Sequence, residues 1–439
     1  MFNNLKSNYN QFPKNFWMVA FTSFIDQLGS FILMPFIALY ITARYDIGMT
    51  QVGFIFAIVG AGNMIGGILG GALTDKFGRK TMTLFGLLAS GSFSIVIIFI
   101  DSLTVLYFVI LAMGLMGSLA GPARSAMMAD ILPPEKRTEG FGILRITMNL
   151  AATIGPALGG FLAARSFTAL FIVDAVSSGI TGLLFYFVIP ETKPKAAEDA
   201  VPETLKQSMG GYKDVLKDWK FMIFVGVSSL MALVYMQMQG TLSVFLRDSH
   251  DFSTVNFGYL ISLNAFMVVI FQFWLTKRIK KFPALIMMAV GNIIYGIGFG
   301  LYGFISTVPL FFVAMAIITV GEMITAPFSQ TIAANFAPED KRGRYMAVMQ
   351  WTGILPMLFG VIGAGLIMDN WDSRWVWYFA GIFSALAALG FALLHRAIKS
   401  SDKKLSVQDS LVVNSQETEA FSMEIPVKFD KDLEISILE

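Results

Sequence analysis

Long apolar stretches alternate with short polar ones along almost the whole chain. A helix that crosses a bilayer needs about 20 apolar residues. Six stretches of this kind lie near residues 16–42, 50–74, 81–100, 104–129, 140–164 and 167–190. Six more lie near residues 220–246, 255–276, 284–304, 307–335, 344–368 and 374–397. The pattern predicts an all-α membrane protein with twelve transmembrane helices.

The polar segments divide the chain into five parts. We expect a polar N-terminus at residues 1–15, a six-helix bundle at 16–190 and a second six-helix bundle at 220–397. Between the bundles, residues 191–219 are charged and interrupted by prolines, which is typical of a linker. The tail at 398–439 mixes polar, acidic and scattered apolar residues. It shows no helix-length periodicity, so the sequence predicts a tail without regular structure.

Basic residues collect in every second loop, which sets the orientation. Most Lys and Arg residues between helices fall on one side, whereas the opposite loops carry only Arg44, Arg165, Arg247 and Arg374. Cytoplasmic loops carry the excess of Lys and Arg. We therefore expect both termini and the linker to be cytoplasmic, in a cell (inner or plasma) membrane.

The two bundles repeat each other at a constant offset of 205 residues. The matched pairs are Pro122 with Pro327, Ala129 with Ala334, Pro133 with Pro338, Lys136 with Lys341, Arg137 with Arg342, Gly155 with Gly360 and Gly160 with Gly365. Parallel repeats related by an axis along the membrane normal are a transporter arrangement, with the substrate site between the halves near the midplane. Two pseudo-symmetric six-helix halves are therefore predicted.

Composition narrows the function classes. The chain is 55% hydrophobic and 14% charged, with a net charge of +2, no cysteine and two histidines. Its basic residues form short clusters between apolar stretches, which argues against nucleic-acid binding. We expect no metal site and no cofactor, and the chain shows no phosphate loop and no nucleophile with a placed base, so an enzyme is not expected.

The loop between the second and third helices reads GGALTDKFGRK, residues 70–80. Here the chain resembles the major facilitator superfamily, whose signature loop has this form. The resemblance implies the major facilitator fold and a conformational latch between the halves. Asp130, at the end of helix four, would complete the charge cluster. The residues expected in this latch are Gly71, Asp75, Gly78, Arg79, Lys80 and Asp130.

Helix five carries the stretch NLAATIGPALGG, residues 149–160. Its small residues permit close helix contact, and a proline within it bends the helix. The helix-packing residues are Gly155, Pro156, Gly159 and Gly160. Together with residues 122–145 and 321–346, this stretch resembles bacterial drug:proton antiporters of the DHA1 type. With the fold pattern, the resemblance covers about residues 16–397. In that branch an arginine stands early in helix four, where this chain has Ile110, and Arg145 is a candidate substitute.

Two carboxylates stand near the middle of apolar helices. A charge at a helix centre costs about 2.5–3.5 kcal/mol on insertion scales, so it needs a partner, water or a function. Asp26 in helix one and Glu322 in helix ten are therefore candidates for proton coupling, with Arg145 as the positive charge beside them. Arg124 and Asp174 are expected to be anchoring or packing residues.

Polar and aromatic residues in the same helices are candidates for binding the substrate. They are Asn149, Tyr235, Gln237, Gln239, Asn264, Gln330, Gln350 and Trp351. Aromatic faces, amides and the 26 methionines suit amphipathic cations.

The sequence thus predicts a secondary active transporter. The favoured interpretation is proton-coupled efflux, that is antiport, of lipophilic or cationic small molecules by alternating access. Its partners would be the substrate, protons and the lipid bilayer, and we expect a monomer. The first alternative is a carrier, proton-coupled or facilitated, for a specific metabolite such as a sugar, peptide or organic acid. A sensor that does not transport is the second.

Overall fold

The computed structural model describes residues 11–193, 215–338 and 342–423. In this part of the chain, 12 helices are long and apolar enough to cross a membrane. The N-terminal half consists of α2 (Lys14–Leu33), η1 (Met34–Phe36), α3 (Ile37–Tyr45), α4 (Met49–Phe77), α5 (Arg79–Ile98), α6 (Leu103–Ser118), α7 (Ala120–Ile131), η2 (Pro134–Lys136), α8 (Arg137–Ala163) and α9 (Phe167–Val188). The C-terminal half consists of α11 (Trp219–Gly240), α12 (Leu242–His250), α13 (Thr254–Ile279), α14 (Ala284–Leu301), α15 (Val308–Phe336), α16 (Arg342–Met349), α17 (Trp351–Asn370) and α18 (Trp375–Met423).

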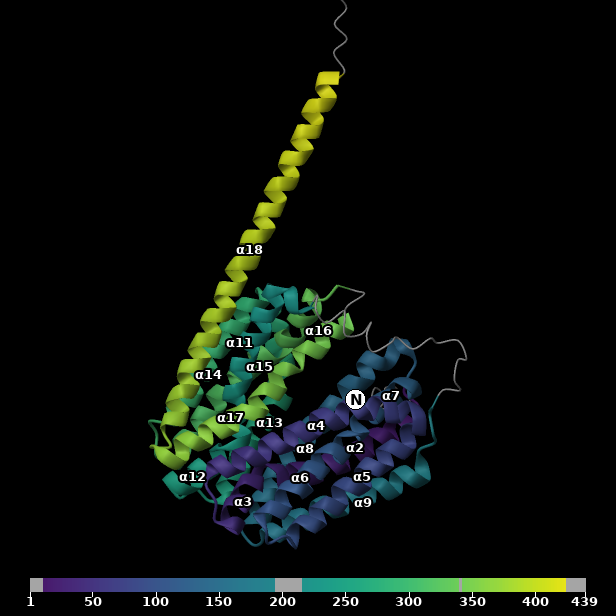
Figure 1. Cartoon of the computed structure of the whole chain (residues 1–439), viewed down its shortest axis with the longest axis vertical. Coiled ribbons are helices and arrows are strands. Elements are labelled where there is room, and N and C mark those ends of the chain that lie inside the picture. The colour runs from purple at the N-terminus through teal and green to yellow at the C-terminus, as the bar shows by residue number, and fades with distance from the viewer. Residues whose placement is uncertain (1–10, 194–214, 339–341, 424–439) are drawn as a thin grey trace, which may run out of the picture.

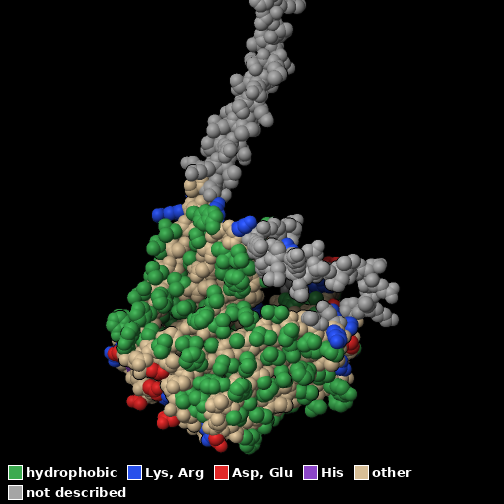
Figure 2. Space-filling model, viewed as in Figure 1, with side chains coloured by type: hydrophobic (Ala, Val, Ile, Leu, Met, Phe, Trp, Pro, Cys, Tyr) green, Lys and Arg blue, Asp and Glu red, His purple; other side chains and the backbone are tan. Residues whose placement is uncertain are grey.

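The two halves lie side by side, as Figure 1 shows in purple to teal and in teal to yellow. Contact between them runs mainly through two helix pairs, α4 with α17 and α8 with α13. Hydrophobic side chains cover the flank of the bundle in Figure 2. Lys and Arg side chains mark the end from which α18 emerges and at which α4 and α5 join. We call this end, which carries residues 76–80 and 191–193, the linker end.

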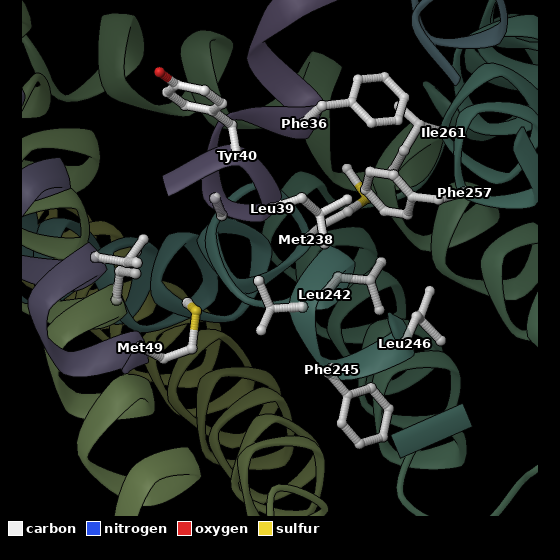
Figure 3. Packing of buried hydrophobic residues seen from close by; sticks show 14 of the residues in the cluster. Phe36, Leu39, Tyr40, Met49, Met238, Leu242, Phe245, Leu246, Phe257 and Ile261 are labelled. Carbon is white, nitrogen blue, oxygen red and sulfur yellow. The ribbon is translucent and has the colours of Figure 1, made fainter. Parts of the chain in front are cut away.

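At the end away from the linker the halves share one buried core. Phe36 and Leu39 of the N-terminal half pack there with Leu242, Phe245 and Phe257 of the C-terminal half (Figure 3). The rings of Phe36 and Phe257 meet edge to face, with centroids 5.6 Å apart. This end of the bundle is therefore closed between the halves.

At the linker end each half has its own core. One cluster there contains residues from 215 to 394 only, and another contains residues from 12 to 189 only. A Cβ placed on Gly71 of α4 would meet no atom of the described residues within 4 Å. The cores therefore separate toward the linker end while they merge at the other.

The tail departs from the sequence-based prediction. Residues 399–423 continue the last transmembrane helix, so that α18 runs for 49 residues to Met423 (Figure 1). No glycine or proline interrupts the sequence between Gly390 and Pro426. Since adding a residue to an existing helix is far easier than starting one, the transmembrane segment nucleates the extension. Residues 424–439 lie outside the described residues, as do 1–10 and 194–214 of the predicted N-terminus and linker.

Candidate functional site

Glu322 lies about midway along α15 and is partly buried. Its carboxylate accepts a hydrogen bond from Asn264 Nδ2 of α13 at 2.8 Å, and Tyr235 of α11 places its hydroxyl 3.5 Å away. The same Asn264 amide donates to Thr319 one turn along α15 at 3.0 Å. Three helices of the C-terminal half thus meet at one carboxylate, and each of these partners is uncharged.

Two further residues complete this cluster. Gln239 hydrogen-bonds with Tyr235. The sequence analysis named both residues as candidates for substrate binding. Tyr295 of α14, which sequence reasoning missed, is 5% exposed and lies within electrostatic reach of Glu322. Its hydroxyl hydrogen-bonds with Thr325, one turn beyond Glu322. A tyrosine within a largely apolar helix was the available signal, but nothing in the sequence distinguished it from a packing residue.

Asp26 has a different environment, within the N-terminal half. It is 8% exposed, and its Oδ2 lies 2.7 Å from Arg124 Nη1 of α7. Ser178 of α9 donates to the other oxygen at 3.1 Å. Arg124, expected to be an anchoring or packing residue, forms an ion pair within the N-terminal half. Ala123, Met127 and Met128 form the buried face of α7, and this spacing of three to four residues was the signal that Arg124 lies beside the core.

Asp174 of α9 also has a polar environment that the sequence did not predict. It is 4% exposed and accepts a hydrogen bond from Ser94 of α5 at 2.6 Å. Ser30 of α2 hydrogen-bonds to it as well. The description of Asp174 as a simple packing residue is therefore incomplete, because it joins three helices and lines a cavity.

Arg145 is not paired with either carboxylate in the described part of the chain. Its side chain is exposed, and it acts on Glu322 through space across the boundary between the halves. Asn149 lies one turn further along α8 and is partly buried. The positive charge that touches a buried carboxylate is thus Arg124, on helix four.

The remaining candidates for substrate binding do not gather around Glu322. Gln237 is 2% exposed and donates to Leu233 O at 3.0 Å and to Gly360 O at 3.2 Å, so it joins α11 to α17. Gln350 and Trp351 are exposed at the junction of α16 and α17. The side chain of Gln330 lies outside the described residues.

The signature loop makes contacts within the N-terminal half and with the first residues of the linker. Arg79 Nε lies 3.2 Å from Asp130 Oδ2, and Lys80 Nζ donates to Tyr186 O at 2.7 Å. Glu191 accepts hydrogen bonds from the backbone N–H groups of residues 79 and 80. It thereby satisfies two of the unpaired donors at the start of α5. The Asp75 side chain lies outside the described residues.

Gly78 forms the corner between α4 and α5. Its φ is +96°, a backbone conformation that residues with a Cβ rarely adopt. The helices on either side can therefore follow each other without a longer loop.

The Gly-Pro stretch of α8 contacts both halves. Gly155 and Gly159 pack on α2, at Phe31 and Ile32. A Cβ on Gly160 would lie 2.6 Å from Thr254 O of α13, so this approach between the halves requires glycine. Pro156 stands inside the helix, and its carbonyl faces α13 at Gly258.

At the closed end, Asp369 of α17 joins the halves through the backbone. Its two oxygens accept hydrogen bonds from the N–H groups of Met49 and Thr50, both at 2.8 Å, at the start of α4. An acidic side chain is favourable at a helix N-terminus, where N–H groups are unpaired and the helix dipole is positive. Arg247 of α12 adds a second bridge, to Thr42 of α3 at 3.0 Å.

Comparison with known proteins accounts for this architecture. The sequence profile of the Major Facilitator Superfamily matches residues 19–354 and 279–425. The chain belongs to this superfamily. It is a multi-pass membrane transporter and not an enzyme, and the predicted major facilitator fold is confirmed.

Relatives of the chain include transporters with named activities. A "Na(+), Li(+), K(+)/H(+) antiporter" of Planococcus maritimus is 27% identical over 87% of this chain and 92% of its own length. The multidrug resistance protein MdtH of Salmonella typhimurium is 23% identical over 84% and 92%, respectively. A crystal structure of a POT family transporter with a thioalcohol-conjugated peptide superimposes with a TM-score of 0.75, at 16% identity over 88% of this chain and 97% of that one. At this level of identity the likeness shows a shared fold and nothing more.

Proposed function

We propose that this superfamily member exports lipophilic, often cationic, small molecules in exchange for protons, with Glu322 as the carboxylate that couples the two. The observation that carries the proposal is that Asn264 and Tyr235, the side chains that donate hydrogen bonds to Glu322 at 2.8 and 3.5 Å, are both neutral. Hydrogen bonds from neutral donors orient the carboxylate without neutralising its charge. A proton or a cationic substrate can each supply the missing positive charge, but not both together.

Asp26 has a structural role in this proposal. Its ion pair with Arg124 and its bond from Ser178 already satisfy its charge. Loss of the charge on Asp26 would leave the partly buried Arg124 without its partner, which is costly. We therefore assign Asp26 to holding α2, α7 and α9 together, and proton coupling to Glu322.

Alternating access would use the two ends of the bundle in turn. In the orientation that the basic loops favour, the linker end faces the cytoplasm, and the structure represents the state whose outer end is closed. In this state substrate would enter from the cytoplasm or the inner leaflet and displace the proton from Glu322. The loop around Arg79 and Asp130 would then latch the linker end when the outer end opens.

The relatives support antiport in a general way. One is named as an antiporter that exchanges alkali cations for protons, and another as a multidrug resistance protein. The first name states exchange of cations for protons, and the second states resistance to several drugs.

Inverted membrane vesicles with an acid interior test the proposal. Wild type is expected to accumulate ethidium, a fluorescent lipophilic cation, and to release it when a protonophore removes the gradient. Glu322→Gln should abolish the accumulation, because a neutral amide cannot exchange a proton for a cation. Glu139→Gln is a matched control, since it removes an exposed carboxylate that pairs with Lys136 at the start of α8. Accumulation by Glu322→Gln at the wild-type level would refute the role of Glu322.

A second candidate is exchange of alkali cations for protons, which the name of the relative from Planococcus maritimus favours. The same vesicles distinguish this exchange from the export of lipophilic cations. Adding NaCl, LiCl or KCl would raise the internal pH if these ions are substrates, whereas ethidium alone would do so under the first proposal.

Uptake of a sugar, peptide or organic acid is the alternative that reverses the direction. Arg145, exposed on α8, would then pair with a substrate carboxylate. Whole cells decide between the two, because an exporter depletes its substrate from the cell and an importer accumulates it.

A further inference from the structure

The N-terminal half encloses a cavity of about 200 Å³, away from the Glu322 cluster. Helices α2 to α6 and α9 form its wall, and Met357 of α17 lies against it from the other half. The lining is almost wholly apolar and includes Phe56, Ile110 and Phe171. An enclosed apolar space with a few converging polar groups is the usual form of a small-molecule site.

One carboxylate belongs to this cavity. Asp174 lines it together with Ser30 and Ser94, whose hydroxyl groups hydrogen-bond to the carboxylate. No Lys or Arg of the described residues forms an ion pair with Asp174. Asp26 lies within electrostatic reach of Asp174, and Arg124 is paired with Asp26. Two hydroxyl groups therefore hold the carboxylate in place while its charge has no cationic partner.

Aromatic side chains line the same cavity as this carboxylate. Tyr40 and Phe171 line the same cavity, and their ring centroids are 4.6 Å apart. Phe171 and Asp174 stand three residues apart on α9 and therefore on the same face. A cation bound here would meet a negative charge and the faces of aromatic rings, and both attract ammonium groups more strongly where water is absent.

We propose that this cavity is a second ligand site, for a small hydrophobic monocation of the aromatic ammonium class, with Asp174 as its counter-ion. Pockets for drug-sized ligands span about 300–1,000 Å³, so the smaller volume here selects small cations. The site is separate from Glu322, which belongs to α15 of the other half. The inference goes beyond the proposed function, because it concerns equilibrium binding and holds whatever the coupling or direction of transport.

Binding of benzyltrimethylammonium to the purified full chain in detergent tests this site, by isothermal titration. The titration uses Glu322→Gln as its background, so that the proposed coupling carboxylate does not contribute to cation binding. This protein is expected to bind one equivalent, and Asp174→Asn in the same background to bind roughly tenfold or more weakly, a loss of about 1.4 kcal/mol. The amide keeps the size of the carboxylate and can still accept the hydrogen bond from Ser94. Glu139→Gln in the same background is the matched control, because it removes an exposed carboxylate of α8 and should leave the affinity unchanged.

Ile110→Phe is the second variant, which keeps Asp174 and fills the cavity. Ile110 is 3% exposed and lines the wall, so the larger ring should exclude the ligand even though the charge remains. Loss of binding in Asp174→Asn and Ile110→Phe, but not in Glu139→Gln, each in the Glu322→Gln background, would establish the site. Absence of binding to that background, unchanged affinity in Asp174→Asn or Ile110→Phe, or loss in Glu139→Gln would overturn it. None of these results depends on ethidium transport, so the two proposals fail separately.

Discussion

Each half holds one of the two carboxylates considered for proton coupling, and the surroundings of the two are opposite. In the N-terminal half Asp26 is paired with Arg124 at 2.7 Å. In the C-terminal half Glu322 receives hydrogen bonds from the neutral groups of Asn264 and Tyr235. Both side chains stand near the middle of an apolar helix, so position alone did not separate them. Their partners do.

The difference separates a structural charge from an exchangeable one. A buried ion pair that loses one member leaves the other uncompensated, so its protonation state is tied to the stability of the fold. A carboxylate among neutral donors can gain or lose a proton while its hydrogen-bond partners stay in place. The comparison therefore predicts that stability depends on Asp26 and transport on Glu322.

Asp26→Asn should have the largest effect on stability. It leaves the partly buried Arg124 without a counter-charge, and we expect a loss of about 3 kcal/mol in the free energy of unfolding, at the lower end of the range for a buried pair. Glu322→Gln should cost about 1 kcal/mol or less, because the amide oxygen still accepts from Asn264. Unfolding of the purified variants by sodium dodecyl sulfate measures both. Equal losses in the two variants would remove the distinction between the carboxylates.

Removing both charges of the pair should restore much of that loss. In Asp26→Asn/Arg124→Gln no uncompensated charge remains, so the double variant should be more stable than Asp26→Asn by about 2 kcal/mol, within the usual range of coupling between contacting residues. The same unfolding assay on the four proteins of this double-mutant cycle gives the coupling energy. A double variant as unstable as the sum of the single ones would show that the two side chains act independently.

Asn264→Leu probes the other carboxylate and should have an intermediate effect. It leaves Glu322 and Thr319 without a shared donor at 2.8 and 3.0 Å, at an expected cost of about 1–3 kcal/mol. Gln350→Leu, at the exposed junction before α17, is the control and should change stability by less than about 0.5 kcal/mol. If the two substitutions cost the same, Asn264 does not support Glu322.

Substitution of His250 should have the smallest effect on stability. It separates the acid sensitivity that His250 contributes from that of the two carboxylates. It lies beyond the membrane span, between the rings of Phe245 and Phe311, with centroids 5.1 and 4.8 Å away. Burial, and secondarily the positive charge of Arg374, lower the pKa of His250 below its usual value of about 6.5. The folded chain therefore binds this proton less readily than the unfolded chain.

The sign of the pH dependence follows from this difference. Stability from neutral His250 is present above about pH 6.5 and is lost as the pH falls below that value toward the lower pKa of the folded state. His250→Phe keeps an aromatic ring in the site, and it should flatten the stability profile between pH 6.5 and 5, in unfolding measured across this range. An unchanged profile would assign the acid sensitivity to the carboxylates instead.

The fold could be predicted from the sequence almost completely, because a membrane allows few solutions. Apolar length sufficed to predict twelve helices, and the constant offset of 205 residues sufficed to predict two repeated halves. The tail was the exception, since the absence of periodicity along residues 399–423 did not reveal that an existing helix would continue.

The site was predictable only in part. Glu322, Asn264 and Tyr235 were identified because polar residues are rare in such helices. Their partners were not: Arg145 was expected beside a carboxylate, whereas Arg124 lies there. Which side chains meet depends on the rotation of each helix about its axis, and one sequence contains that information only through the faint spacing of buried residues such as Ala123 and Met127.

The shared core at the closed end also determines which conformation the empty carrier favours. Opening that end would separate Phe36, Leu39, Leu242, Phe245 and Phe257, and each large apolar side chain transferred to water costs about 1.5–3 kcal/mol. Because every 1.4 kcal/mol changes a population ratio tenfold, an empty carrier would spend most of its time with the linker end accessible. Turnover would then be paced by how often this core comes apart, and a ligand speeds it only if it binds the opened form more tightly.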